Sequence, residues 1–268
     1  MASIRYVYPF SSLMQIPLYR IEQRLFVNKV EPLTILPNLL QSKYPMSHPK
    51  KPEAIRPRAF GSLFLTFCKE FLNPARNGLP FSLPPEDIVH WFRENRFWGR
   101  RPDPVPPPFP WLNYNLLRWI ERLGPRTVFE WGSGASTIWF SRLPTSPKVV
   151  SVESDPKWHA AVDASLSVHR SQTKLYLRQE KADYLEAFRS SGILPPDLIL
   201  IDGLWRDECL LEALPCIAKS SSIIFHDSHA QRHRKCFANL PSSILKTEHY
   251  GPCHGIKNFR GWTLLQAR

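Results

Sequence analysis

Four acidic residues occupy equivalent places in the sequence, each at the end of a predicted strand or one residue beyond it. They are Glu130, Glu153, Asp202 and Asp227. A single acid in such a place often caps the next helix, but four together favour a shared site. In a parallel sheet the carboxyl ends of the strands lie at one edge, where ligands bind near the point at which the strand order reverses. We therefore expect these carboxylates to line a ligand-binding edge.

A glycine-rich loop follows the first of these acids. The stretch 127–137 begins as a short apolar strand, turns at Gly132 and Gly134, and continues into an apolar helix. Because glycine has no Cβ, a ligand can approach the backbone closely there, and the start of the helix offers free N–H groups. This pattern predicts a site for a nucleotide-type cofactor.

The residues around the loop distinguish between two cofactors. Glu153 follows Gly134 by 19 residues, a spacing that suits the ribose hydroxyls of either NAD or S-adenosylmethionine. A dinucleotide site would need a third glycine where Thr137 stands, and Glu130 would repel a pyrophosphate. The sulfonium and ammonium groups of S-adenosylmethionine are instead attracted to an acid at that place. The loop therefore favours the sulfonium cofactor.

Alternating strands and helices are expected to position these residues. The predicted strands span 127–131, 148–153, 174–179, 197–202, 222–226, 244–250 and 260–267. The predicted helices between them span 135–143, 156–168, 183–190, 207–219 and 230–239, and another precedes them at 111–123. Five apolar strands separated by helices predict a parallel sheet covered on both faces. The last two strands lack a helix between them, which predicts an antiparallel edge.

The loop resembles a known family motif. The segment Phe-Glu-Trp-Gly-Ser-Gly at 129–134 resembles motif I of class I S-adenosylmethionine-dependent methyltransferases, and 150–153 looks like their second-strand acid. Further positions similar to a poorly characterised group of small methyltransferase domains are Asp202-Gly203, Arg206, Cys209 and Asp227-Ser228. The chain departs from this pattern at Ser136, where many members have a third glycine, and at 220–222, where two glycines are usual. The resemblance covers residues 111–268.

The resemblance implies a fold and a set of cofactor contacts. The fold is α/β, with a Rossmann-like seven-stranded sheet of order 3-2-1-4-5-7-6 and an antiparallel strand 7. Glu130 would lie near the methionine end of the cofactor, Glu153 at the ribose and Asp183 at the adenine, although Asp183 could equally cap the helix that begins there. The other expected cofactor contacts are Gly132, Ser133, Gly134, Ser136, Thr137 and Asp202.

A looser resemblance concerns a metal ion. Asp202 and Asp227 match positions that hold a metal in catechol-type O-methyltransferases, which use two acids and an asparagine. Such oxygen ligands suit Mg²⁺, which would polarise a substrate hydroxyl. Ser228 stands where the asparagine is found, and this weakens the match.

Three residues are candidates for catalysis, namely Asp202, His226 and Arg206. Without a metal, Asp202 could bind the amino group of the cofactor or orient the substrate. His226 ends a strand and could act as a general base or as a hydrogen-bonded structural residue. Arg206 and the basic run at 231–235 read either as a solvated surface or as a positive lip for an anionic or sugar-like acceptor.

Basic residues are concentrated near the N-terminus. The chain has 268 residues and a net charge of +12, and half of that excess falls within residues 1–60. This composition permits anionic small molecules or nucleic acid as partners. We expect a basic, Pro-rich extension over 1–101, a linker over 102–110 and the methyltransferase-like domain over 111–268. The oligomeric state has no signature in the sequence.

Local patterns refine the picture of the extension. Apolar residues at helical spacing predict helices at 60–72 and 85–96, so the extension should be partly helical. Six prolines occur among residues 102–110. They predict a stiff polyproline II spacer, with a ligand for a proline-recognising module as the alternative.

The cysteines and the apolar runs bear on location. Five cysteines are scattered without CxxC spacing, which is typical of reduced thiols in an intracellular protein. No apolar run has the roughly 18 residues of a membrane span, and the N-terminus lacks the apolar region of a secretory signal. A cytoplasmic location is expected, with an organelle transit segment as the alternative.

These observations converge on a function. The sequence predicts an S-adenosylmethionine-dependent methyltransferase that acts on oxygen of a small or polyhydroxylated acceptor. The alternatives are an RNA-directed methyltransferase or a nucleic-acid-binding protein on the same fold, and next an NAD-dependent oxidoreductase.

Overall fold

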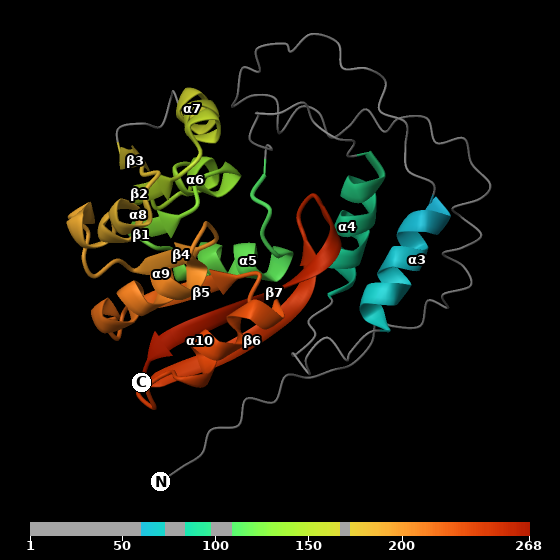
Figure 1. Cartoon of the computed structure of the whole chain (residues 1–268). Coiled ribbons are helices and arrows are strands. Elements are labelled where there is room, and N and C mark those ends of the chain that lie inside the picture. Colours follow the sequence, from blue (N-terminus) through green and yellow to red (C-terminus); the bar gives the residue numbers. More distant parts are fainter. Residues whose placement is uncertain (1–59, 73–83, 98–108, 167–171) are drawn as a thin grey trace, which may run out of the picture. The chain divides into compact units, whose positions relative to one another are not determined.

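The computed structural model describes residues 60–72, 84–97, 109–166 and 172–268 (Figure 1). Of the expected extension over 1–101, residues 60–72 and 84–97 are described, and the remainder lies outside the described residues. So does the proline-rich linker, apart from its last two positions. The domain boundaries drawn from the sequence therefore stay a prediction.

A seven-stranded sheet forms the centre of the described part, in the order β3-β2-β1-β4-β5-β7-β6. The strands are β1 (Thr127–Trp131), β2 (Lys148–Glu153), β3 (Thr173–Leu177), β4 (Leu198–Ile201), β5 (Ser222–His226), β6 (Ile244–Cys253) and β7 (Ile256–Ala267). The first five strands are parallel, and β7 runs antiparallel to both β5 and β6. This confirms the fold that the resemblance implied. The strand order reverses between β1 and β4, which places the glycine loop beside Asp202.

Helices alternate with the strands as expected, although several are shorter than the sequence indicated. They are α5 (Tyr114–Leu123), α6 (Ala135–Phe140), α7 (Pro156–Ser165), α8 (Lys181–Glu186), α9 (Arg206–Ala213) and α10 (Arg234–Ala238). Short 3₁₀ turns follow or precede them at η2 (Arg189–Ser191), η3 (Leu214–Cys216) and η4 (Gln231–His233). The predicted helix 207–219 stops early because Pro215 has no N–H to donate to a carbonyl of the preceding turn.

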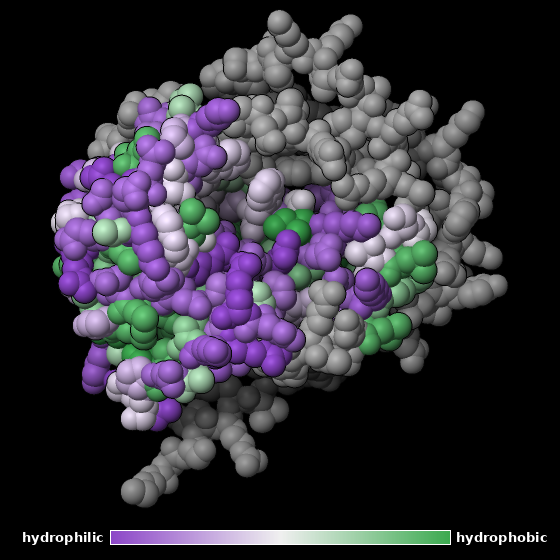
Figure 2. Space-filling model, in the orientation of Figure 1, coloured by the Kyte–Doolittle hydropathy of each residue, from purple (hydrophilic) through white to green (hydrophobic). Residues whose placement is uncertain are grey.

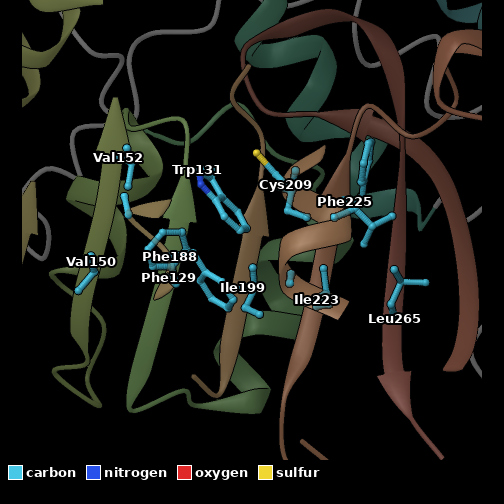
Figure 3. Packing of buried hydrophobic residues seen from close by; sticks show 14 of the residues in the cluster. Phe129, Trp131, Val150, Val152, Phe188, Ile199, Cys209, Ile223, Phe225 and Leu265 are labelled. Atoms are coloured by element: carbon cyan, nitrogen blue, oxygen red, sulfur yellow. The ribbon is translucent and has the colours of Figure 1, made fainter. Parts of the chain in front are cut away.

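Apolar side chains cover both faces of the sheet. On one face, Phe129 and Trp131 of β1 pack with Phe188 and with residues of α8 and α9 (Figure 3). On the other face, Val128 of β1 packs against α5 and α6, and α7 packs on α6 through a smaller cluster. The strands therefore read as continuous apolar runs because both of their faces are buried.

Two helices of the N-terminal extension pack on the last two strands. They are α3 (Phe60–Phe71) and α4 (Pro85–Phe97), and both fall where the sequence predicted helices. Leu63 of α3 and Trp91 of α4 are fully buried in a cluster with Tyr250 of β6 and Phe259 of β7. Other apolar residues of α3, such as Leu65, are exposed. Hydrophobic surface is visible over this helix in Figure 2. The two helices therefore extend the core beyond the sheet.

Candidate active site

The loops after β1 and β4 touch each other through their glycines. Gly132 has φ 95°, in the left-handed region that favours glycine, and a Cβ there would lie 2.5 Å from Cα of Gly203. A Cβ on Gly203 would in turn lie 2.0 Å from the hydroxyl of Tyr184. Side chains at either position would force the two loops apart. The glycines thus set the spacing of the two strand ends at the switch point.

Glu130 is a buried carboxyl with three hydroxyl partners. Its side chain is 0% exposed, and it accepts hydrogen bonds from Ser136, Thr137 and Ser151. Burial raises the pKa of Glu130 to about 7, although the three hydroxyls act in the opposite direction. Both oxygens are occupied, so the carboxyl ties β1 to α6 and β2. Its contact with a cofactor stays a prediction.

Glu153 organises the far side of the same loop. One carboxylate oxygen accepts from the backbone N–H groups of Ser154 at 2.7 Å and Asp155 at 2.9 Å, and the other accepts from the Ser133 hydroxyl at 3.1 Å. The indole of Trp158 donates to the carbonyl of Ser133 at 2.7 Å. The turn after β2 and the loop after β1 are therefore held together as one unit beside this acid.

Asp183 lies in the first turn of α8. The N-cap of that helix is Glu180, so the alternative that Asp183 is the cap is not what the structure has. Asp183 borders an open hollow of about 590 Å³, together with Arg178 and Ser190. A contact between Asp183 and adenine stays a prediction.

The three predicted catalytic residues meet at the ends of β4 and β5. Nδ1 of His226 lies 3.1 Å from Oδ1 of Asp202, and a guanidinium nitrogen of Arg206 lies 3.1 Å from the same oxygen. Arg206 also donates to the backbone carbonyls of Asp202, Gly203 and His226 at 2.7–2.9 Å. The Arg206 guanidinium is thus held by hydrogen bonds and an ion pair with other groups of the protein.

Asp227 completes this group from the residue after β5. Its backbone has φ 59°, and its carboxylate lies 3.4 Å from Arg206 and 3.5 Å from Arg260. Burial would raise the pKa of Asp227, but the positive charges of His226, Arg260 and Arg206 outweigh it and hold the pKa below its usual range. Asp227 is therefore a paired carboxylate.

The predicted metal site does not fit this arrangement. Oxygen and nitrogen atoms of Asp202, His226 and Asp227 lie within 4.8 Å of one another, a spacing that a metal ion could bridge. The Arg206 guanidinium, however, already contacts both carboxylates, and Arg260 adds a second positive charge. A divalent cation would have to displace an arginine that makes three backbone hydrogen bonds. We therefore derive no chemistry through Mg²⁺.

Two residues of the site had no signal in the sequence. Asn113 is fully buried and its side-chain oxygen lies 3.2 Å from Nε2 of His226. Arg260 comes from β7, far from every motif. An asparagine before a helix reads as a cap and an arginine in a strand as a surface residue. The antiparallel return of β7 beside β5 brings Arg260 to the strand ends, and a β-bridge to Cys253 places Asn113 there.

Comparisons with known proteins concern the fold. No protein-family model and no curated protein matches this chain. Among solved structures, the cofactor-bound protein Rv0187 from MTB is 16% identical with a TM-score of 0.50, and the match covers 82% of this chain and 99% of that one.

Two further structures are similar at lower TM-scores. The O-methyltransferase TomG from Streptomyces achromogenes, in complex with SAM, is 18% identical with a TM-score of 0.47, covering 81% of this chain and 91% of that chain. An O-methyltransferase from Bacillus cereus, in complex with SAH, is 18% identical with a TM-score of 0.47, covering 76% and 91%. The chain has the fold of class I S-adenosylmethionine-dependent methyltransferases. Within its described residues, no helix is long and apolar enough to cross a membrane.

Proposed function

We propose that this protein is an S-adenosylmethionine-dependent methyltransferase that methylates oxygen of a small, hydroxylated acceptor. The observation that carries the proposal is the arrangement of Glu153 beside the glycine loop at the switch point of the sheet. Backbone N–H groups and the Ser133 hydroxyl fix this carboxylate at the strand end. An acid so placed suits the two ribose hydroxyls of the cofactor.

The cofactor half of the proposal uses the remaining loop residues. Gly132 and Gly134 would pass under the cofactor, and Asp183 would meet the adenine beside the hollow after β3. Ser136 and Thr137 are engaged with Glu130, so they would act by holding the loop in shape. Asp202 lies across the switch point, next to the same loop, because Gly203 directly after it contacts Gly132.

The acceptor half of the proposal centres on Asp202. Its side chain is 24% exposed, and among the described residues only Oδ1 has partners, which leaves Oδ2 open. The acceptor hydroxyl would donate its hydrogen bond to Oδ2. Bound S-adenosylmethionine would supply an activated methyl group, with the electron pair of the broken sulfur–methyl bond left on sulfur. Asp202 would orient the acceptor oxygen toward that methyl group and would take up the hydroxyl proton.

Calorimetry of cofactor binding tests the assignment. We expect S-adenosylmethionine to bind the wild-type chain, and Glu153→Ala to weaken binding by about 10-fold to 100-fold because hydrogen bonds to a charged group are lost. The matched control is Glu121→Ala, an exposed acid on α5, which should bind as the wild type does. No binding by the wild type, or equal binding by Glu153→Ala, would rule the proposal out.

A further inference from the structure

Asn113 makes three side-chain hydrogen bonds in the interior of the protein. Its amide nitrogen donates to the carbonyl of Gly251 at 2.9 Å and to the carbonyl of Arg260 at 3.0 Å. Because carbonyls only accept, these two bonds fix which end of the amide is nitrogen. The amide oxygen then faces Nε2 of His226 at 3.2 Å. An amide oxygen only accepts, so Nε2 must carry a hydrogen.

The position of Asn113 in the sequence suggests a helix cap, but its side chain has a different role. It is the N-cap residue of α5, where asparagine usually accepts a hydrogen bond from the first turn of the helix. Here the side chain makes no such bond. Its hydrogen-bonding capacity is spent on β6, β7 and His226 instead. Two of the three bonds hold the strands, and the third reaches the candidate active site.

His226 has little freedom to turn. The ring is 2% exposed, with Nε2 facing Asn113 and Nδ1 facing Oδ1 of Asp202. With the Nε2 hydrogen held by Asn113, the contact with Asp202 falls to Nδ1. That nitrogen lies against the carboxylate that we place at the acceptor. Neither nitrogen faces the acceptor directly, so the imidazole acts through Asp202.

The N-terminal extension supports this arrangement from behind. The turn between β6 and β7 is held by α4, because Trp91 donates to the carbonyl of Ile256 at 2.9 Å and the Gly255 N–H donates to Glu94 at 3.3 Å. Glu94 also pairs with His254 at 2.8 Å. The backbone of Asn113 also forms an isolated antiparallel β-bridge with Cys253. The amide of Asn113 is therefore placed by several independent contacts.

We propose that Asn113 is a positioning residue for methyl transfer, acting through His226 on Asp202. It fixes the Nε2–H form of the ring, so that Nδ1 holds Oδ1 of Asp202 and Oδ2 stays turned toward the acceptor. This inference rests on the proposed function for its catalytic meaning. The hydrogen position that it requires can be tested without any substrate.

The test is nitrogen-15 NMR of the full chain labelled at histidine. The His226 signals are assigned from their absence in His226→Gln. In the wild type we expect Nε2 of His226 to be protonated, with a hydrogen that exchanges slowly with solvent. In Asn113→Ala that slowly exchanging hydrogen should be lost. In Asn115→Ala it should remain, because Asn115 accepts from Trp262 and does not contact His226.

Asn113→Asp keeps the test decisive if the alanine variant does not fold. A carboxylate at this position can still accept from Nε2–H but cannot donate to Gly251 or Arg260. We expect it to retain the protonated Nε2. An unprotonated Nε2 in the wild type, or an unchanged slow hydrogen in folded Asn113→Ala, would overturn the inference. Calorimetry on the same samples separates the two proposals. If the wild type does not bind the cofactor, the proposed function is rejected, but the inferred hydrogen on Nε2 is not.

Discussion

The two halves of the candidate site treat their carboxylates in opposite ways. On the β1–β2 side, Glu130 and Glu153 are held by hydroxyls and backbone N–H groups, which are neutral. On the β4–β5 side, Asp202 and Asp227 are paired with Arg206, and Asp227 also with Arg260. Neutral donors do not cancel a negative charge, so Glu153 can present one to a cationic cofactor, whereas Glu130 is buried and its pKa is raised. On the β4–β5 side the arginines neutralise the charge of the carboxylates. This half of the site therefore needs no added cation and suits the transfer of one proton.

Removal of Arg206 should have the largest effect on the difference between the two halves of the site. Arg206→Met leaves two poorly exposed carboxylates without their main partner, and we expect a loss of about 3 kcal/mol in the free energy of unfolding. Urea denaturation measures it. Arg189→Met is the matched control, because Arg189 is 57% exposed and its surface pair with Glu212 should contribute less than about 1 kcal/mol. Equal losses in both variants would show that the buried pairing is unimportant.

The neutral environment of Glu130 predicts a pH dependence. Burial raises the pKa of Glu130 from 4.5 to about 7, so the folded protein keeps a proton that the unfolded chain releases. Stability from this group therefore falls as the pH rises from about 4.5 to about 7. Glu130→Gln cannot titrate, and its stability relative to the wild type should rise across that interval by on the order of 3 kcal/mol.

Urea denaturation at pH 5 and pH 8 gives this difference. Glu121→Gln, an exposed substitution on α5, serves as the control for general effects of pH. A constant difference between Glu130→Gln and the wild type would mean that the hydroxyls keep Glu130 ionised throughout.

The smallest expected effect concerns divalent cations. Because Arg206 occupies the space between Asp202 and Asp227, millimolar Mg²⁺ should leave the melting temperature of the wild type unchanged. In Arg206→Met no arginine lies between the two carboxylates, although Arg260 still contacts Asp227, and Mg²⁺ should raise the melting temperature of that variant. A Mg²⁺-dependent increase in the wild type would instead favour the metal site that the sequence resembled.

The fold could be predicted from the sequence because it depends on local signals. Apolar runs mark the strands, and glycine at 132 and 134 marks the turn that a ligand could approach. The sheet order came from the resemblance, and the structure confirms it. The helix ends were less accurate, as at Pro215, because they depend on single residues.

The acceptor half was less accessible to sequence reasoning. Asp202, His226 and Arg206 were found because each lies near a strand end, and the structure brings them together. What the sequence could not give was the partner of each group. The metal expectation arose because two acids were visible while the arginine between them read as a surface residue. Asn113 and Arg260 are 147 residues apart, and only tertiary structure joins them.

The placement of β7 bears on how the chain is assembled during synthesis. The last strand lies between β5 and β6, so β6 cannot join the sheet until nearly the whole chain has been made. Trp91 is synthesised early, yet its hydrogen-bond partner lies 165 residues later. Until then the apolar faces of α3 and α4 lack the strands that bury them, and such exposed surface promotes association between incomplete chains. Among the described helices, the two made first are thus the last to be secured.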